Sequence, residues 1–299
     1  MISSNHSVRI RSHGITIYVL VRGEKCGNLI YYTRIISSMA TSRSLEKKLD
    51  QKVALITGAS SGIGRATAVL FSRLGARLAL TGRNQENLTK SAEECETASP
   101  YNLKPLCIVG DLTIESDIER IMKSTIDTYG RLDILVNNAG MLALDSAQKG
   151  SLETLDLVWK TNVRAVYHLT MLAVPHLIES KGSIVNVSSI LSKRGYATTL
   201  SYTMSKGAID QFTRSVALDL APRHVRVNSV NPATIETNIY SAVGADVKEI
   251  MEEVARSYPL GRGGQPEEVA TAIAFLASDE ASFISGETLV IDGARIASC

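Results

Sequence analysis

"KVALITGASSGIGRATAVLFSRLG", residues 52–75, contains a strand-like run, a glycine-rich turn and a helical pattern in direct succession. Residues 52–57 are apolar and β-branched, which predicts a short buried strand. Gly58, Gly62 and Gly64 follow, and glycines let a backbone turn tightly and approach a ligand closely. The helix that starts there supplies free N–H groups and partial positive charge, which suit a pyrophosphate. Because the spacing differs from the commoner G-x-G-x-x-G, an ordinary tight turn is the alternative.

The alternation of strand and helix continues to the C-terminus. Helical patterns separate further apolar runs at 77–81, 103–110, 132–138, 182–189, 225–232 and 287–292. Apolar strands between amphipathic helices are typical of a parallel sheet covered on both faces. We therefore predict a single-domain α/β Rossmann fold, a doubly wound parallel sheet of about seven strands, over residues 47–299.

The composition is that of an ordinary globular protein. Hydrophobic residues make up 44% and charged residues 21% of the 299 residues, and the formal net charge is +2. This charge and the absence of Lys/Arg runs predict no nucleic-acid partner, and the longest apolar run near the start is too short to span a membrane. The cysteines lie far apart without a His cluster, which predicts reduced thiols and no metal site.

Residues 1–46 form an N-terminal extension of different character. Six Lys/Arg and a single acid, Glu24, lie between Met1 and Ser44, as in a mitochondrial transit peptide. The run "ITIYVLV" (15–21) is rich in β-branched residues, so an amphipathic targeting helix is not obvious. Met39 could equally be the true start. A cytoplasmic enzyme with a disordered or spurious extension and a mitochondrial enzyme with a transit peptide over 1–38 both stay open.

The end of the second strand bears on the choice of cofactor. An acid at this place would bind the adenosine ribose and disfavour a 2′-phosphate, but "LTGRN" (80–84) has Gly82 there, followed by Arg83. A guanidinium can grip a phosphate with two parallel hydrogen bonds. We therefore expect NADP(H) in preference to NAD(H), with a merely solvated Arg83 as the alternative.

Polar residues follow the next two strands. Asp111, in "GDLT", could accept a hydrogen bond from an adenine amino group, or it could cap the helix that starts near Glu115. The small residues of "NNAG" (137–140) would let the adenosine ribose lie close to the chain. Asn137 has a structural interpretation, as a hydrogen-bonding link between the sheet and this loop.

"SYTMSKGAI", residues 201–209, holds a tyrosine and a lysine four positions apart on a predicted helix. Residues at i and i+4 share one helix face, so the Lys206 ammonium would lie near the Tyr202 phenol and lower its pKa from about 10. Ser189, at the end of the fifth strand, would hold the substrate oxygen; strand alternation points Ser188 the other way. Tyr202 is then a general acid for carbonyl reduction or a base for alcohol oxidation.

These motifs together resemble the short-chain dehydrogenase/reductase family over residues 50–293. The chain carries TGxxxGIG at 57–64, NNAG at 137–140, Tyr-x-x-x-Lys at 202–206 and a serine thirteen positions before the tyrosine (202 − 189 = 13). Within the family, the chain resembles NADP-preferring carbonyl reductases and 3-oxoacyl-carrier-protein reductases. The resemblance implies that Tyr202 is the acid/base, that Lys206 also binds the nicotinamide ribose, and that Ser189 orients the substrate.

The resemblance also gives a role to Asn162, in "KTNVRAV". It would hold a water that links Lys206 to solvent, although from the residues alone Asn162 is simply a polar residue that breaks an apolar helix. The expected cofactor-binding residues are Gly58, Ser60, Ser61, Gly62, Ile63, Gly64, Arg83, Asp111, Leu112, Asn138, Ala139, Gly140, Tyr202, Lys206, Pro232 and Thr237.

One departure from the family pattern follows the sixth strand. The family usually has Pro-Gly and then a threonine, whereas this chain reads "NPATIET", with Ala233 in the place of the glycine while Pro232 and Thr237 keep their spacing. A methyl group there narrows the space beside the nicotinamide or requires a different turn.

The segment 236–264 is expected to cover the site as a mobile lid with glycines as hinges. The expected substrate-lining residues are Ser189, Leu191, Tyr196 and Ile239, with Met141, Leu142, Ile190 and Tyr240 nearby. An apolar pocket favours uncharged small-molecule carbonyls such as ketones, aldehydes, diketones, steroids or quinones. An acyl-carrier protein could instead dock through rim residues such as Arg194 and Arg262.

Helical stretches at about 152–178 and 201–221 carry more apolar surface than one sheet face can bury, so we expect association. The family resemblance implies a homotetramer. Two other functions compete with an NADPH-dependent reductase: an NAD-dependent alcohol or hydroxysteroid dehydrogenase, and a non-catalytic NADP-binding sensor or scaffold.

Overall fold

The computed structural model describes residues 6–12, 15–21 and 48–298. The chain divides into two compact units, Met1–Lys47 and Lys48–Cys299. In the first unit, β1 (His6–Ser12) pairs antiparallel with β2 (Ile15–Val21), which is the β-branched run noted in the sequence. The expectation of a disordered or targeting extension falls largely outside the described residues, and it stays a prediction.

The second unit contains a seven-stranded sheet in the order β5-β4-β3-β6-β7-β8-β9, and every pairing in it is parallel. Its strands are β3 (Val53–Thr57), β4 (Arg77–Gly82), β5 (Leu106–Val109), β6 (Ile134–Asn137), β7 (Ser183–Val187), β8 (Arg226–Pro232) and β9 (Thr288–Ile291). Each predicted strand is present, so the prediction of a doubly wound, Rossmann-like α/β domain is confirmed.

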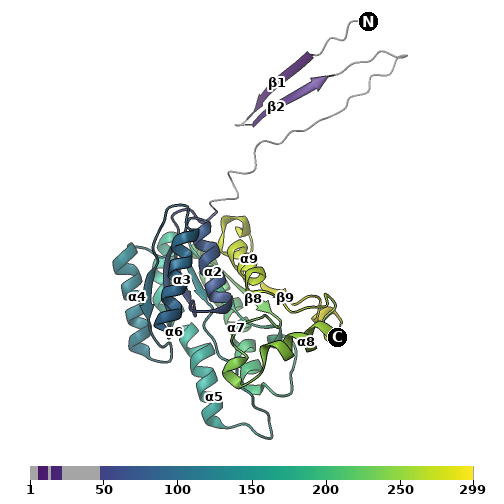
Figure 1. Ribbon diagram of the computed structural model, residues 1–299. Helices are drawn as coiled ribbons and strands as arrows, with labels where there is room; N and C mark the ends of the chain where they lie inside the picture. Colours follow the sequence, from purple (N-terminus) through teal and green to yellow (C-terminus); the bar gives the residue numbers. More distant parts are fainter. Residues whose placement is uncertain (1–5, 13–14, 22–47, 299) are drawn as a thin grey trace, which may run out of the picture. The chain divides into compact units, whose positions relative to one another are not determined.

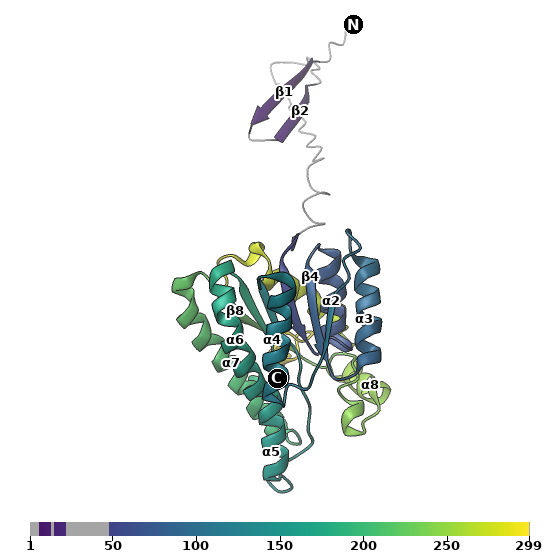
Figure 2. The same ribbon diagram turned by 90° about the vertical axis from the view of Figure 1, so that its left-hand side faces the viewer.

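Helices cover both faces of this sheet (Figures 1 and 2). They are α2 (Gly62–Arg73), α3 (Gln85–Ala98), α4 (Glu115–Tyr129), α5 (Leu152–Trp159), α6 (Ala165–Ser180), α7 (Leu200–Leu220), α8 (Val247–Ser257) and α9 (Pro266–Ala277). Neighbouring residues of β3 point to opposite faces of the sheet, and each face is covered by its own layer of helices. Ile56 packs in the core with α2, α3 and α9, and Leu55 packs in the core with α4, α6 and α7.

The long helix expected over 152–178 is interrupted. Residues Lys160–Arg164 form one π-helical turn between α5 and α6, in which the N–H of Ala165 donates to the carbonyl oxygen of Lys160. Such turns insert one residue into a helix and occur often at functional sites. The sequence pattern did not predict this turn, because its apolar spacing fits an ordinary helix. The helix expected over 201–221 is present as α7.

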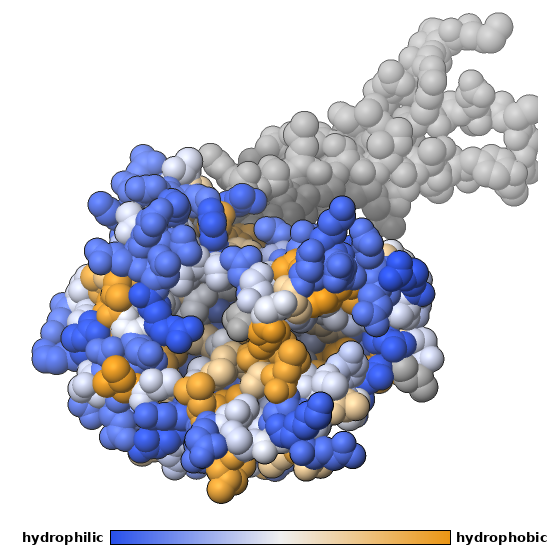
Figure 3. All heavy atoms as spheres, turned by 60° about the horizontal axis from the view of Figure 1, so that its bottom comes forward, coloured by the Kyte–Doolittle hydropathy of each residue, from blue (hydrophilic) through white to orange (hydrophobic). Residues whose placement is uncertain are grey.

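The carboxyl ends of the parallel strands all lie along one edge of the sheet. The direction in which the chain winds reverses between the neighbouring strands β3 and β6. In Figure 3 this edge comes forward, and hydrophobic side chains gather across the centre of the exposed face among hydrophilic ones. The motif residues singled out in the sequence follow the strands at this same edge.

Candidate active site

The glycine turn after β3 is packed too closely to accept side chains. Gly58 and Gly62 have φ values of +65° and +53°, a left-handed conformation that favours glycine. A Cβ atom on Gly58 would lie 2.8 Å from Nδ2 of Asn138, and one on Gly62 would lie 3.0 Å from Cγ2 of Thr237. Thr237, expected at the cofactor site, is thus brought against the turn.

The start of α2 is open to an anion. Ser61 occupies the N-cap position with an extended backbone, and within the described chain its side chain makes no capping hydrogen bond. The first N–H groups of a helix have no partner within it, and they carry the positive end of its dipole. A glycine cradle and an open helix start together fit the pyrophosphate of a dinucleotide.

The loop after β6 is bound to this turn through two side chains. Nδ2 of Asn138 donates to the carbonyl oxygens of Thr57 at 2.8 Å and Gly58 at 3.2 Å. Oγ1 of Thr57 accepts from the N–H groups of Asn138 and Ala139, both at 3.0 Å. Thr57 was not among the expected site residues, although it is the first residue of the glycine motif.

Asn137, one residue earlier, has a structural environment. It is buried, and its amide donates to Oδ1 of Asn186 at 2.9 Å and to Oγ1 of Thr170 at 3.2 Å. Asn137 therefore has a structural role, as predicted, but it links β6 to β7 and α6 rather than the sheet to the loop.

The end of β4 carries a glycine against which a serine side chain packs. Gly82 is buried, and a Cβ atom placed on it would overlap Oγ of Ser60. The next residue, Arg83, is exposed. At the end of β4, where an adenosine ribose would lie, the chain therefore has a glycine and then an exposed arginine in the place of an acid.

Asp111 builds a turn before α4. Its Oδ1 accepts from the N–H of Thr113 at 2.8 Å, and its own N–H donates to Oδ2 of Asp117 at 2.8 Å. The N-cap residue of α4 is Ile114, so Asp111 does not cap the helix directly. Leu112, beside it, is half-buried.

Ser189, Tyr202 and Lys206 meet between the end of β7 and α7. Nζ of Lys206 donates to the carbonyl oxygen of Val187 at 2.8 Å and lies 5.5 Å from the centre of the Tyr202 ring. A side-chain hydrogen bond joins Ser189 to Tyr202. One hydroxyl, one phenol and one ammonium are thereby gathered where the end of β7 meets α7.

Burial controls the proton affinities of this group. Burial raises the pKa of Tyr202 above its usual value, and the nearby phenol of Tyr240 adds to the rise. Burial lowers the pKa of Lys206 to about 8, against the opposing effect of Asp210. The net direction for Tyr202 is upward, opposite to the direction expected from Lys206 alone, because desolvation of the phenolate is the largest effect.

The two serines after β7 point in different directions, as predicted. Oγ of Ser188 donates to the carbonyl oxygen of Lys206 at 3.2 Å and so packs against α7. Oγ of Ser189 accepts from the N–H of Leu191 at 3.2 Å and lies 3.5 Å from the carbonyl oxygen of Pro232. The expected cofactor residue Pro232 is thereby next to the Ser189 hydroxyl.

Asn162 lies in the π-helical turn and holds the loop after β6. Its Nδ2 donates to the carbonyl oxygen of Met141 and to Oγ of Ser205, both at 3.0 Å, and its Oδ1 accepts from the N–H of Met141 at 2.8 Å. A Cβ atom on Gly140 would lie 3.3 Å from Oδ1 of Asn162 and 3.6 Å from Nζ of Lys206. The side chain therefore acts as a clamp here, and the water relay stays a prediction.

Asp145 is a further residue that the sequence reasoning missed. It is buried and accepts hydrogen bonds from the N–H of Ser201, at 3.0 Å, and from the Ser201 hydroxyl. A carboxylate at a helix N-terminus is favourable, so Asp145 fixes the start of the helix that carries Tyr202. An acid in an irregular loop gives no sequence signal for this role.

The expected substrate residues are enclosed to different degrees. Leu191 and Ile239 are half-buried, whereas Tyr196 is 57% exposed and is therefore not enclosed by the described chain. The rim residue Arg262 forms two hydrogen bonds with Glu268, at 2.7 and 2.8 Å.

The two ends of segment 236–264 are tied together. The N–H of Glu236 donates to the carbonyl oxygen of Gly264, and the N–H of Gly264 donates to that of Thr234, both at 3.0 Å. Between them lie a short 3₁₀ turn, Ser241–Val243, and α8. Oγ1 of Thr234 is hydrogen-bonded to the Tyr258 hydroxyl at 2.8 Å, which links the far end of the segment to β8.

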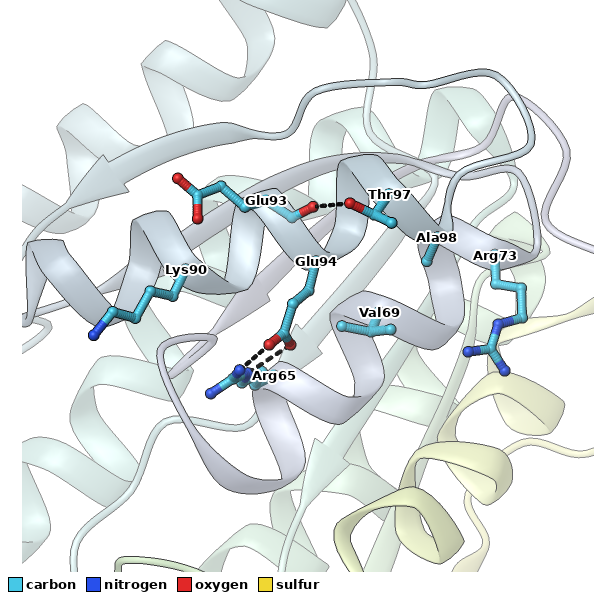
Figure 4. Close-up of a pocket in the computed structure, with 8 residues that line it drawn as sticks. All are labelled: Arg65, Val69, Arg73, Lys90, Glu93, Glu94, Thr97 and Ala98. Atoms are coloured by element: carbon cyan, nitrogen blue, oxygen red, sulfur yellow. Dashed lines mark hydrogen bonds and ion pairs between the residues drawn. The ribbon is translucent and has the colours of Figure 1, made fainter.

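A hollow between α2 and α3 lies apart from this site (Figure 4). The ion pair of Arg65 and Glu94 crosses it. Its remaining lining residues are Val69, Arg73, Lys90, Glu93, Thr97 and Ala98. Over the described ranges we find no cluster of His, Cys, Asp and Glu that could hold a metal. Over these ranges, too, every helix is too short or too polar to cross a membrane.

Comparison with known proteins agrees with this geometry. A family model described as "Enoyl-(Acyl carrier protein) reductase" matches residues 58–294. The chain is 38% identical to a 3-oxoacyl-[acyl-carrier-protein] reductase of Thermotoga maritima, over 83% of this chain and 99% of that protein. It is 35% identical to a meso-2,3-butanediol dehydrogenase of Serratia marcescens, over 84% and 97% of the two chains.

Two solved structures are also similar. One is a short-chain dehydrogenase/reductase of unknown function from Caenorhabditis elegans with cofactor, with a TM-score of 0.78, 37% identity, and coverage of 84% of this chain and 97% of that one. The other is a 3-ketoacyl-(acyl-carrier-protein) reductase from Brucella melitensis complexed with NADH, with a TM-score of 0.76, 33% identity, and coverage of 83% and 99%. The chain therefore belongs to the short-chain dehydrogenase/reductase family and is an oxidoreductase that acts on carbonyl or alcohol groups.

Proposed function

We propose that this protein is an NADPH-dependent reductase that converts an uncharged ketone, aldehyde or diketone into an alcohol. The observation that carries the proposal is the meeting of Ser189, Tyr202 and Lys206 beside the glycine turn and the loop at 138–140. The cofactor supplies the hydride when it is bound.

The residues of the chain then handle the proton and the substrate oxygen. The Ser189 hydroxyl would donate to the carbonyl oxygen, and Tyr202 would transfer its phenolic proton to that oxygen as general acid. Burial raises the pKa of Tyr202, so the phenol is protonated at neutral pH, as an acid must be before it acts. Lys206, held by Val187, would stabilise the phenolate that remains and bind the nicotinamide ribose.

Two features support NADP(H) over NAD(H). The acidic side chain that would disfavour a 2′-phosphate is absent, because residue 82 is a glycine, against which Oγ of Ser60 packs. Arg83 is exposed at the same place and can pair with a phosphate. NAD(H) is the alternative, since the similar reductase from Brucella melitensis was solved with NADH.

The apolar centre of the site face supports an uncharged substrate, with segment 236–264 as its lid. The similarity to a butanediol dehydrogenase supports, as the second candidate, oxidation of a small secondary alcohol. The similarity to a 3-oxoacyl-[acyl-carrier-protein] reductase supports carrier-bound acyl groups as a further substrate class.

We further propose that the protein is a homotetramer that associates through its helical face. Large hydrophobic side chains are exposed on α5, α6 and α7, namely Leu152, Leu157, Trp159, Tyr167, Met171, Leu200, Met204 and Leu218. A non-catalytic sensor is disfavoured, because folding alone does not require Ser189, Tyr202 and Lys206 to converge.

The test is a comparison of cofactor consumption. Absorbance at 340 nm would be followed with NADPH or NADH and a panel of diketones, ketones, aldehydes, quinones and acyl-thioesters. Secondary alcohols would be tested with the oxidised cofactors. We expect carbonyl-dependent oxidation of NADPH to be fastest. Faster reaction of NAD⁺ with alcohols would favour the dehydrogenase, and NADPH binding without turnover of any substrate would favour the sensor.

A further inference from the structure

A buried carboxylate lies one helical turn beyond Lys206. Asp210 is 3% exposed, and both its oxygens lie 2.9 Å from Nδ2 of Asn231, which is fully buried in β8. Buried carboxylates are expensive unless they are paired and hydrogen-bonded. In the part of the chain that the structure describes, Asp210 forms no ion pair. The cation on the same helix face is Lys206, at i−4, whose protonated form Asp210 favours.

The Asp210 carboxylate fixes the orientation of the Asn231 amide. A carboxylate only accepts hydrogen bonds, so the NH₂ end of the amide must face it, and the amide oxygen then faces Ser229, whose hydroxyl donates to it at 2.9 Å. An NH₂ group has two hydrogens. One hydrogen is donated to Asp210, and the other points to the turn after β7.

That second hydrogen reaches the turn that carries the reacting serine. Nδ2 of Asn231 lies 3.1 Å from the carbonyl oxygen of Ser189 and 2.8 Å from Oγ of Ser192, and the Ser192 hydroxyl itself donates to the Ser189 carbonyl oxygen at 2.6 Å. The chain of contacts therefore runs from Asp210 through Asn231 to the backbone of Ser189.

We propose that Asp210 and Asn231 are a pair of positioning residues that hold the Ser189 turn and the Lys206 ammonium in register for reaction. The inference rests on the proposed function. Asp210 acts on both sides of the site: its charge favours the protonated form of Lys206, and its hydrogen bonds orient the amide that anchors Ser189. Neither residue touches the reacting atoms.

The other groups around Lys206 do not replace Asp210. On α7 the titratable neighbour is the Tyr202 phenol, and beside that phenol lies Tyr240, from the segment before Ser241. The turn after β7 contributes the Val187 carbonyl, while the loop at 138–140 and the π-helical turn contribute Gly140 and Asn162, all uncharged.

The first test is Asp210→Asn, with Asp133→Asn as the matched control. Asp133 is also a buried carboxylate, but it binds Arg131 and the N–H of Val53 at the opposite ends of the strands. We expect Asp210→Asn to bind NADPH within about twofold of wild type, to lose about 10- to 100-fold in kcat, and to lose activity on the alkaline side about one pH unit earlier. Asp133→Asn should lower Tm and leave the pH profile in place.

The second test exchanges the pair. In Asp210→Asn/Asn231→Asp an amide again meets a carboxylate, so Tm should recover relative to Asn231→Asp alone. Turnover should stay low, because a carboxylate at 231 cannot donate to the Ser189 carbonyl oxygen. If the exchange restores both Tm and turnover, the pair is merely structural and the positioning role is refuted.

Ser192→Ala is a third test, which decides the question if the Asp210 variants do not fold. It removes only the hydroxyl between Asn231 and Ser189 and should lower kcat about three- to tenfold, as expected for one lost positioning hydrogen bond. Unchanged kcat would overturn the proposal. A wild-type enzyme without turnover of any carbonyl would contradict the proposed function and this role with it, whereas an active wild type matched by Asp210→Asn would contradict the positioning role alone.

Discussion

The ammonium of Lys206 donates a hydrogen bond of 2.8 Å to the carbonyl oxygen of Val187, the last residue of β7. This bond ties α7 to the carboxyl end of the central sheet and turns the ammonium over the Tyr202 ring. Helix α7 is also held at its start by Asp145. Tyr202 therefore lies between two fixed points, which favours a preorganised proton donor.

Carbonyl reduction should fall as the pH rises through about 8, because burial lowers the pKa of Lys206 to about 8 and the reaction uses its protonated form. The stability effect has the opposite sign. The unfolded lysine holds its proton up to a pH of about 10.5, so between about 8 and 10.5 the unfolded state binds more protons and this group makes stability rise with pH.

The measurement is kcat and chemical unfolding of wild type and Lys206→Met from pH 6 to 10.5. The variant should be nearly inactive throughout, and its stability relative to wild type should decrease as the pH rises above 8. A wild-type rate that stays flat up to pH 10 would contradict this assignment.

Removal of Arg83 should affect one cofactor only. In Arg83→Ala we expect KM for NADPH to rise about 10- to 100-fold, since a hydrogen bond to a charged group is worth about 1.5–3 kcal/mol, while KM for NADH stays the same. Arg73→Ala removes an exposed arginine at the far end of α2 and serves as the control. An equal rise in KM for both cofactors would show that Arg83 does not bind the 2′-phosphate.

Asn162→Ala should lower both stability and activity. It leaves the N–H and carbonyl of Met141 without their partner, which costs about 1–3 kcal/mol of unfolding free energy, and it releases the loop beside Lys206. Asn228 is a matched control away from the site, because its buried amide also makes two bonds to the backbone. It donates to the carbonyl oxygen of Ile284 and accepts from the N–H of Glu287. Asn228→Ala should lose similar stability but keep kcat, and an equal loss of kcat in both variants would argue against a role of Asn162 in the site.

A charge on the exposed helical face should dissociate the enzyme. Tyr167 and Met171 lie one turn apart on α6 and are 54% and 56% exposed. If this face joins subunits, Tyr167→Glu/Met171→Glu would bury two unpaired carboxylates and should shift light-scattering mass from tetramer to a smaller species. A wild-type monomer, or a double variant that stays tetrameric, would contradict association through α6.

Much of this fold is predictable because local signals and long-range packing agree. The apolar run before Gly58 and the similar runs later in the chain predict buried strands, and the seven strands occur in the expected order. The spacing of Tyr202 and Lys206 directly implies a shared helix face. The π-helical turn at Asn162 is different, since its apolar spacing fits a regular helix. It is distinguished by the bond from the N–H of Ala165 to the carbonyl oxygen of Lys160, which no sequence pattern marks.

The supporting residues of the site could not be predicted for a related reason. Asp145, Asp210 and Asn231 act through partners that are 56 or 21 positions away in the sequence. No local pattern marks such pairs, because each polar residue could equally face solvent. The direction of the Tyr202 pKa was likewise out of reach, since it depends on how completely the phenol is buried.

The most direct test of the central claim is single-turnover oxidation of NADPH by Tyr202→Phe with the best carbonyl substrate. We predict NADPH binding like that of wild type and a hydride-transfer rate at least about 10²-fold lower, because the general acid is lost. Tyr129→Phe, which removes a half-buried phenol bonded to the Leu78 carbonyl oxygen at 2.8 Å, is the control and should react at the wild-type rate. A Tyr202→Phe rate within threefold of wild type would contradict the account.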